Sequence, residues 1–459
     1  MWTRTRVKYH IPTDIQTLYN QSVSFLDLDS AAVARALSLI SSDSDDVVDA
    51  FFERREEIEL SPPGEERPRI WREQGLSVRL VRDRESWLAV RDEISSEAFV
   101  SALRRVARRL SSGVLRAPRV ELSDWPEAVV ESDFQSFSAR VVSRLRAKHL
   151  VFPIRMWLRR HRRWLRVVDR EVAAEPETEL FYSCRVECDW GRWGTLLPQL
   201  DAEAARHVAD SLGAAFRARK AEPPSTGFRP ILLGSSAAAI FLHEAVAHAL
   251  EVDTLALGGD PDAAVGVSMG SDRLDLLDDP TSGPAGLRRR TDDEGAPVLR
   301  RWLLRRGVVE QPLADRRWAG RSMKLSSGAA RRQSRHLGPV PRSLHLELLP
   351  GEQSMAELAE LARPDALFVP EASRGHLEPR TGEFSLTVPY GRRLSGGELG
   401  DRVGSFVIRG KVRSLLGQVI GVGNKSRVGG AGWCAKGGQR MPVWSTTPAV
   451  LLEGAEVGL

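Results

Sequence analysis

The motif His243-Glu244-Ala245-Val246-Ala247-His248 constrains the fold of this chain more than any other feature of its sequence. It lies in an apolar, small-residue segment, Ile231 to Glu251, that we expect to be helical. Two residues five positions apart lie about 140° from each other around a regular α-helix. Both imidazoles can therefore reach one point only if the helix absorbs an extra residue, as it does in a π turn.

The residue types of this motif are those of a metal-dependent hydrolase. Two neutral imidazoles, from His243 and His248, can bind one ion, and the carboxylate of Glu244 beside them can take a proton from a water molecule. Burying such groups in an apolar helix is costly unless they have a partner, and a metal ion would supply one. The alternative is a pair of unrelated histidines, one capping a carbonyl group and one in solvent.

A zinc site of this kind needs a third protein ligand, which leaves the fourth position for water. Cys434 lies in a Gly-rich segment near the C-terminal end, where a turn could expose its thiolate. Glu251 and His376 are the competing candidates. The spacing of these residues in the sequence cannot choose among the three.

Composition and charge exclude several classes of protein. The chain has 459 residues, of which 42% are hydrophobic, enough for two or three domains with packed cores. The chain has 66 Lys and Arg residues and 61 Asp and Glu residues. The resulting net charge of +5 is small for this length, so charge alone does not indicate binding to nucleic acid. Three cysteines cannot form a disulfide framework, and they favour a reducing compartment, so we expect a cytoplasmic protein. Met1–Asp14 lacks the apolar core of a secretory signal, and no apolar stretch reaches the ~20 residues of a membrane-spanning helix.

Residues 221–230 are rich in Pro, Gly and Ser and mark the expected domain boundary. We predict an α+β chain of two domains. The N-terminal α/β domain, residues 1–222, should contain a mixed sheet with helices. The C-terminal domain, residues 223–459, should be largely antiparallel β and carry both the metal-binding helix and the terminal cysteine motif.

Hydrophobic periodicity places the main elements of the N-terminal part. Val47–Leu60 and Leu76–Val90 alternate as strands do, and we expect them to belong to a sheet with one solvated face. Ser95–Ser111 and Asp201–Lys220 have apolar residues at helical spacing, and the first opens with Ser95-Ser96-Glu97, residues typical of a helix start.

Other candidate sites are weaker. Arg155–Arg170 mixes Arg with Trp and could meet phosphates, but a solvated face of a helix or strand explains the pattern better. Cys184 and Cys188 have no matching pair elsewhere, and alternate positions of a strand, Phe181–Trp190, account for them. No phosphate-binding GxxxxGK[ST] or strand-linked GxGxxG occurs, so we expect no nucleotide cofactor.

Several motifs, in this order, resemble the TldD/PmbA metalloproteases, a family once described as modulators of DNA gyrase. The central block, Phe241 to Asp253, is similar to the LHEAxGHxLExD block of that family. The resemblance covers most of the chain and is densest after Gly227. Its other segments are Phe51–Arg55, Gly75–Arg79, Asp278–Pro280, Asp292–Pro297, Gly307–Arg316, Gly375–Ser385 and Cys434–Gln439.

This resemblance implies a two-domain α+β fold and a zinc peptidase that works in the cytoplasm as a dimer, often with a sibling subunit that lacks the metal motif. Carried over residue by residue, it implies that His243, His248 and Cys434 bind Zn²⁺ and that Glu244 is the general base. The implied substrates are extended or unfolded peptides, which can add to the edge of a sheet through backbone hydrogen bonds.

Two positions depart from the family pattern and bear on substrate choice more than on the metal site. Ala247 stands where the family has Gly before the second His, and Arg342-Ser343-Leu344-His345 replaces an Arg-x-(Ser/Thr)-Asn element. The leading hypothesis is a zinc-dependent peptidase. The alternatives are an amidohydrolase that tailors a small peptide-like natural product and a non-catalytic regulatory or binding subunit.

Overall fold

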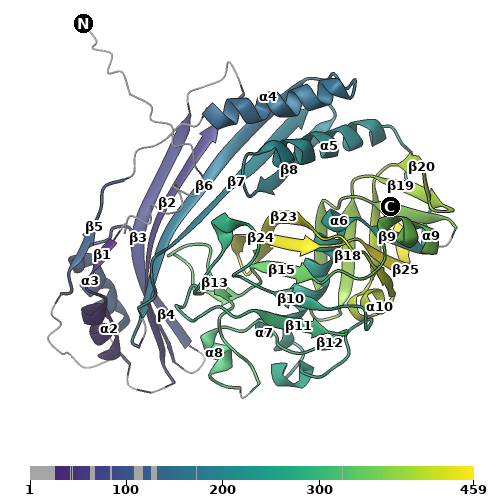
Figure 1. Ribbon diagram of the computed structural model, residues 1–459. Coiled ribbons are helices and arrows are strands. Elements are labelled where there is room, and N and C mark those ends of the chain that lie inside the picture. Colours follow the sequence, from purple (N-terminus) through teal and green to yellow (C-terminus); the bar gives the residue numbers. More distant parts are fainter. Residues whose placement is uncertain are drawn as a thin grey trace, which may run out of the picture.

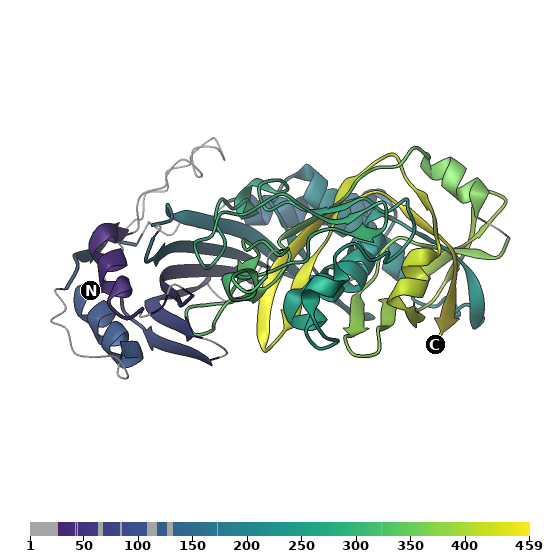
Figure 2. The ribbon, with the colours of Figure 1, turned by 90° about the horizontal axis from the view of Figure 1, so that it is seen from below.

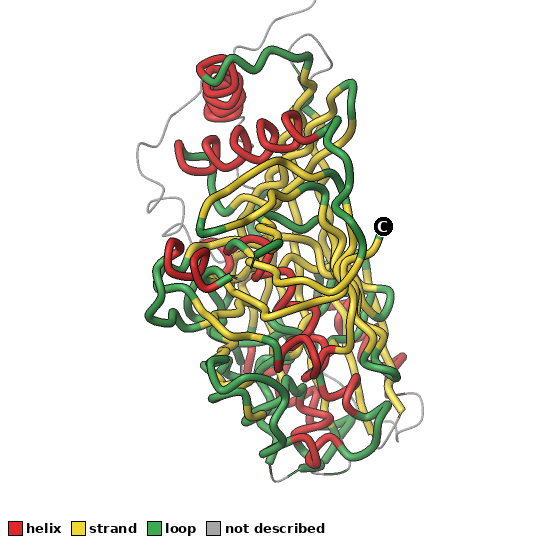
Figure 3. The backbone as a smooth tube through the Cα atoms, turned by 90° about the vertical axis from the view of Figure 1, so that its right-hand side faces the viewer, coloured by secondary structure: helices red, strands yellow, loops and turns green. Residues whose placement is uncertain are grey.

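The computed structural model describes residues 26–41, 43, 45–62, 68–82, 85–107, 117–125, 132–171, 173–322, 324–362 and 364–459. Over these residues the protein is α+β with strands predominating, as the sequence predicts (Figure 1 and Figure 3). The expectations for Met1–Asp14, and for the expected helix beyond Ala107, lie outside the described residues.

The N-terminal part is built on a strongly curved sheet, here called the first sheet, with the strand order β4-β3-β2-β6-β7-β8 (Figure 1). All of its strand pairs are antiparallel, so the prediction of a mixed sheet is wrong. Neighbouring strands run in opposite directions, so the sheet needs none of the long crossover connections that join parallel strands. The strands are β2 (Val47–Leu60), β3 (Arg69–Arg82), β4 (Glu85–Arg91), β6 (Ile154–Asp169), β7 (Glu177–Cys188) and β8 (Gly191–Leu197).

Strand β2 has the bounds that the alternation of Val47–Leu60 predicts. The expected solvated face is wrong, because both faces of this strand are buried over most of its length. Phe51, Phe52 and Glu53 are all fully buried, although successive side chains of a strand point to opposite faces. One face packs against helices and the other against the C-terminal part of the chain. The expected strand Leu76–Val90 is divided between β3 and β4.

Helices cover one face of the first sheet at its two ends. α2 (Ser30–Ser38) and α3 (Ser96–Ala107) pack on the end formed by the start of β2, whereas α4 (Ser132–Ala147) and α5 (Ala202–Ala218) pack near β7 and β8 (Figure 1). Two of them, α3 and α5, match predicted helices, and both are capped. The hydroxyl of Ser95 accepts from the N–H of Ala98, and the carboxylate of Asp201 accepts from that of Ala204. A short ribbon of β1 (Leu26–Leu28) and β5 (Val120–Leu122) lies near α2 and α3.

The C-terminal part contains two further large sheets, largely antiparallel as predicted, and a two-stranded sheet of β13 and β14. The large C-terminal sheet has the order β17-β18-β21-β25-β9-β16-β19-β20, with β22 also paired to β25. The second C-terminal sheet has the order β12-β11-β10-β15-β24-β23. Each contains a parallel pair, β9 with β16 and β15 with β24.

The large sheet comprises β9 (Gly227–Leu233), β16 (Ala366–Val369), β17 (Arg374–Glu378), β18 (Glu383–Val388), β19 (Gly391–Ser395), β20 (Glu398–Val403), β21 (Phe406–Lys411), β22 (Val419–Val422) and β25 (Val450–Gly458). The second sheet comprises β10 (Leu276–Asp278), β11 (Arg301–Arg305), β12 (Val308–Val309), β15 (His345–Leu348), β23 (Arg427–Lys436) and β24 (Gln439–Thr447). The remaining elements are β13 (Ala330–Arg331), β14 (Val340–Pro341), α7 (Val252–Leu255), α8 (Arg316–Ala319), α9 (Met355–Leu361) and α10 (Val412–Gly417).

Helix α6 (Ser235–Leu242) lies between these two sheets and shares their apolar core. Its buried Phe241 packs in one cluster with Leu303 and Leu346 of the second sheet and with Leu386 of the large one. The expected helix Ile231–Glu251 is therefore wrong at its start. Residues 231–233 are the end of β9, because a short apolar run fits a buried strand as well as a helix.

Buried ion pairs join the first sheet to the C-terminal part, which lie side by side in Figure 2. Asp49 of β2 accepts from Arg79 (2.7 Å) and from Arg332 (2.9 Å), and Arg79 also reaches Glu294 (2.5 Å). Burial acts to raise the pKa of Asp49, but the two guanidinium groups outweigh it and hold the pKa below its usual range. The division into two domains at residues 222 and 223 stays a prediction.

Over the described residues, no helix combines the length and the apolar character that crossing a lipid bilayer requires. Cys184 and Cys188 lie on β7 with free thiols, in the strand that the sequence predicts. The Arg-rich stretch is β6, in which Leu158, Trp164 and Leu165 are buried and Trp157 is half-buried. The expected solvated face is wrong, because Arg155 is the one exposed residue of this strand, all of which the structure describes, and Arg160 is buried.

Candidate functional site

A π turn shapes the centre of the site. α6 ends at Leu242, residues His243–Ala247 form a single π turn, and His248–Leu250 follow as a 3₁₀ turn. The N–H of His248 donates to the carbonyl of His243, five residues earlier. The extra residue turns both imidazoles to one side of the helix, so that their ring centroids lie 4.8 Å apart.

Strand β23 brings Cys434 to the two histidines, so the expectation of an exposed turn at this cysteine is wrong. Its Sγ lies 3.2 Å from Nε2 of His248, and the candidate ligand atoms of His243, His248 and Cys434 all lie within 4.8 Å of one another. All three side chains are buried. The other two candidates for a third ligand lie differently. The carboxylate of Glu251 binds the far nitrogen of His248, and His376 is exposed on β17 and is not part of the cluster.

The chemistry of these side chains fits a zinc ion. Burial acts to raise the pKa of Cys434, but the imidazoles of His243 and His248 outweigh it and lower the pKa to about 6, which favours the thiolate. Within the described part of the chain, Nε2 of His243 is buried without a hydrogen-bond partner. A metal ion bound to this nitrogen would supply the missing partner and offset the cost of burying it. Two imidazole nitrogens and one thiolate sulfur are ligands that zinc accepts, with a fourth position left open.

A carboxylate orients one of the imidazoles. Glu251, fully buried, accepts from Nδ1 of His248 at 2.9 Å and from Nη1 of Arg342 at 3.2 Å, and Lys436 also donates to it. Burial acts to raise the pKa of Glu251, but the charges of His248, Arg342 and Lys436 hold it far below its usual range. A carboxylate on the far nitrogen of a histidine fixes the ring and leaves the near nitrogen free for a metal.

Sequence reasoning named Glu251 only as a competing ligand and gave no role to Arg342 or Lys436. Both cations lie far from the motif in sequence, and only the fold shows that they meet Glu251. The one signal available was the position of Lys436, two residues after Cys434, because such residues share a face of a strand.

The second residue of the motif, Glu244, lies beside the cluster. Its Oε2 is 3.9 Å from Nε2 of His248, and its side chain is 18% exposed, so solvent reaches it. Its aliphatic part packs against Gly375 of β17, where an added Cβ would lie 2.3 Å from Cγ of Glu244. The sequence did not single out Gly375 for this contact. A carboxylate in this place can exchange a proton with a water molecule held beside the cluster.

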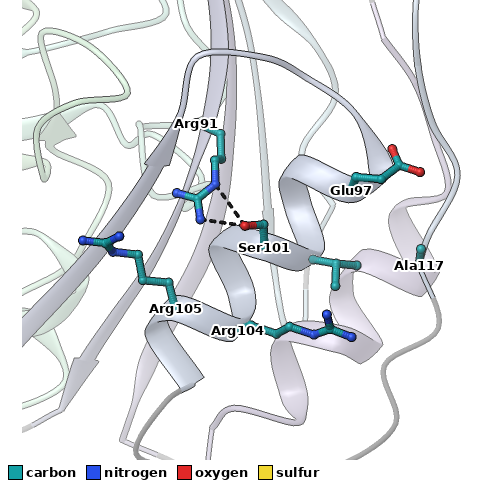
Figure 4. A pocket seen from close by; sticks show the side chains of 7 residues that line it. Arg91, Glu97, Ser101, Arg104, Arg105 and Ala117 are labelled. Atoms are coloured by element: carbon teal, nitrogen blue, oxygen red, sulfur yellow. Dashed lines mark hydrogen bonds between the residues drawn. The ribbon is translucent and has the colours of Figure 1, made fainter.

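A cavity of about 430 Å³ lies elsewhere, on the solvent side of α3 (Figure 4). The guanidinium group of Arg91 donates to the hydroxyl of Ser101 at one wall of it. None of the candidate site residues lines this cavity, so its size is no guide to the chemistry. Its lining residues are Arg91, Glu97, Val100, Ser101, Arg104, Arg105 and Ala117.

Residues 226–459 match the family profile described as the PmbA/TldA metallopeptidase C-terminal domain. A protein named metalloprotease from Methanothermobacter thermautotrophicus is 32% identical over 248 residues, which are 53% of each chain. A protein named zinc metalloprotease TldD homolog from Saccharolobus solfataricus is 25% identical over 240 residues, 52% of this chain and 53% of that protein. The chain thus spans about half the length of the curated relatives it matches.

The fold is similar to that of a solved structure over nearly the whole chain. TldE from Thermococcus kodakarensis superposes with a TM-score of 0.71 and covers 93% of this chain and 100% of its own, at 16% sequence identity. At this identity the similarity bears on the fold alone.

Proposed function

The chain belongs to the PmbA/TldD family of metallopeptidases, and on that premise we propose that it is a zinc-dependent peptidase that hydrolyses extended or unfolded peptides. One observation carries the proposal. His243, His248 and Cys434 converge in a buried cluster, beside a carboxylate that solvent reaches.

In this proposal His243, His248 and Cys434 hold the zinc ion. Zinc, when bound, polarises the scissile carbonyl group and lowers the pKa of a water molecule. The carboxylate of Glu244 would take a proton from a water molecule beside the cluster and would give it to the leaving amine. Glu251 keeps the His248 ring in place through Nδ1.

The proposed substrate class rests on the strands around the site. β17 and β23 are the end strands of the two C-terminal sheets, and both lie against the helix that carries the motif. An extended peptide can pair with such a strand through its backbone, which gives affinity with little dependence on side chains. We also propose a dimer, with a second copy or a sibling subunit lacking the metal motif as its partner.

The test is Glu244→Gln, measured by elemental analysis of zinc and by hydrolysis of an unfolded protein. The variant should keep about one zinc per chain and lose hydrolysis, because an amide cannot accept the proton. Cys434→Ser and His248→Ala should lose both zinc and hydrolysis. Glu398→Gln, on the exposed strand β20, is the matched control. Glu244→Gln that cleaves at the rate of the unaltered chain would refute the mechanism.

A further inference from the structure

Lys436 ties strand β23 to the segment that follows the π turn. It lies two residues after Cys434, so both side chains leave the strand on the same face. Its ammonium group donates to Glu251, to Oδ1 of Asp253 at 2.7 Å and to Oγ1 of Thr254 at 2.8 Å. These three acceptors use all three N–H groups of the lysine.

Over the described residues, the strand that carries Cys434 pairs with only one strand of its sheet. β23 is the end strand of the second C-terminal sheet and lies beside β24 (Figure 1). The register of this pair shifts between Gly429 and Gly432. Gly430 lies within that shift at a positive φ of 58°. From Gly432 to Lys436 the pairing with β24 is regular, so β24 fixes Cys434 within its own sheet. Lys436 adds a contact between this end of β23 and the segment that follows the π turn.

Glu251 links the two segments that carry the proposed ligands, because it contacts both His248 and Lys436. It accepts from His248 on one side and from Lys436 on the other. The chain of contacts therefore runs from the imidazole through one buried carboxylate to the strand that carries the thiol.

We propose that Lys436 is a positioning residue that sets the distance between the thiol of Cys434 and the imidazole of His248. The inference rests on the proposed zinc site and names the contact that keeps its ligands together. Lys436 is 25% exposed, and Glu251 keeps Arg342 as a partner when the lysine is removed, so we expect the substituted chain to fold.

The experiment uses the full chain with cobalt(II) in place of zinc. The Kd for cobalt and the thiolate-to-cobalt charge-transfer absorption are measured for the unaltered chain, for Lys436→Met and for Lys425→Met. Lys425 is exposed and precedes the strand that carries Cys434, and it is the matched control. We expect Lys436→Met to raise the Kd about 10- to 100-fold and weaken the charge-transfer band, as changes around a metal ligand do. The thermal stability of the metal-free chain should hardly change.

Asp253→Asn is the second variant, since it weakens the ion pair between residue 253 and Lys436 and leaves Glu251 unchanged. It should raise the Kd less than Lys436→Met does, and the double variant should bind as Lys436→Met does because both changes break one link. A Kd and a band equal to those of the unaltered chain, in Lys436→Met or in Asp253→Asn, would overturn the inference. An unaltered chain without a charge-transfer band would instead overturn the ligand set of the proposed function.

Discussion

Gly375→Ala should lower hydrolysis strongly without removing zinc. The added Cβ would lie 2.3 Å from Cγ of Glu244, whereas two carbon atoms in contact are about 3.5–4.0 Å apart. Glu244 or β17 must therefore move by more than about 1 Å. Misplacing a catalytic group by about 1 Å can cost about 100-fold in rate, which is about 2.7 kcal/mol.

The assay is steady-state hydrolysis of an unfolded protein by the zinc-loaded chain, with kcat and KM determined separately. We expect kcat to fall about 100-fold, because in the proposed mechanism Glu244 acts on the reacting atoms, while zinc content stays unchanged. Gly417→Ala is the control, since its Cβ meets no atom within 4 Å. A folded, zinc-loaded Gly375→Ala with an unchanged kcat would show that β17 yields instead, and would refute the argument that Gly375 fixes the carboxylate.

Three further predictions concern stability and titration. Arg332→Met should lower the free energy of unfolding by about 3 kcal/mol, because one oxygen of buried Asp49 loses its partner; a urea midpoint equal to that of the unaltered chain would contradict this. Burial raises the pKa of Asp278 from 3.8 to about 6, so the folded state binds the proton more tightly than the unfolded state does. The free energy of unfolding should therefore fall by up to about 3 kcal/mol as the pH rises from 3.8 to about 6. Asp278→Asn should lack this fall when urea unfolding is measured at each pH. In the metal-free chain, alkylation of Cys434, followed by mass spectrometry, should have its midpoint near pH 6 and stop as the pH falls below it, because the thiolate is the reactive form. Cys184, with a pKa of about 12, should stay unlabelled. A midpoint near pH 9 for Cys434 would contradict the effect of the two imidazoles on its pKa.

Local patterns predicted the elements that a local signal defines. Val47–Leu60 alternates over its full length, and the structure has a strand with the same bounds. The i, i+5 spacing of His243 and His248 required a π turn for convergence, and the turn is present. In both cases the information lies within one turn or one strand of the chain.

Contacts between distant parts of the sequence could not be predicted in the same way. The alternation of β2 suggested a solvated face, but its polar side chains are buried because Asp49 meets Arg332, 283 positions away. The third side chain of the cluster was left open among three candidates for the same reason. Cys434 and His248 are 186 positions apart, and only the placement of β23 brings them together.

The π turn ties the site to the number of residues in the helix as well as to their identities. Each residue of a regular helix advances the chain by about 100°. If the segment between Glu244 and His248 were one residue longer, the single π turn could not absorb the addition, and everything after it would rotate by about that angle relative to α6. In such a chain His248 would turn away from His243, and Glu251 would turn away from Arg342 and Lys436. Insertions in this helix are therefore harder for the protein to absorb than most substitutions, and the spacing itself is under structural constraint.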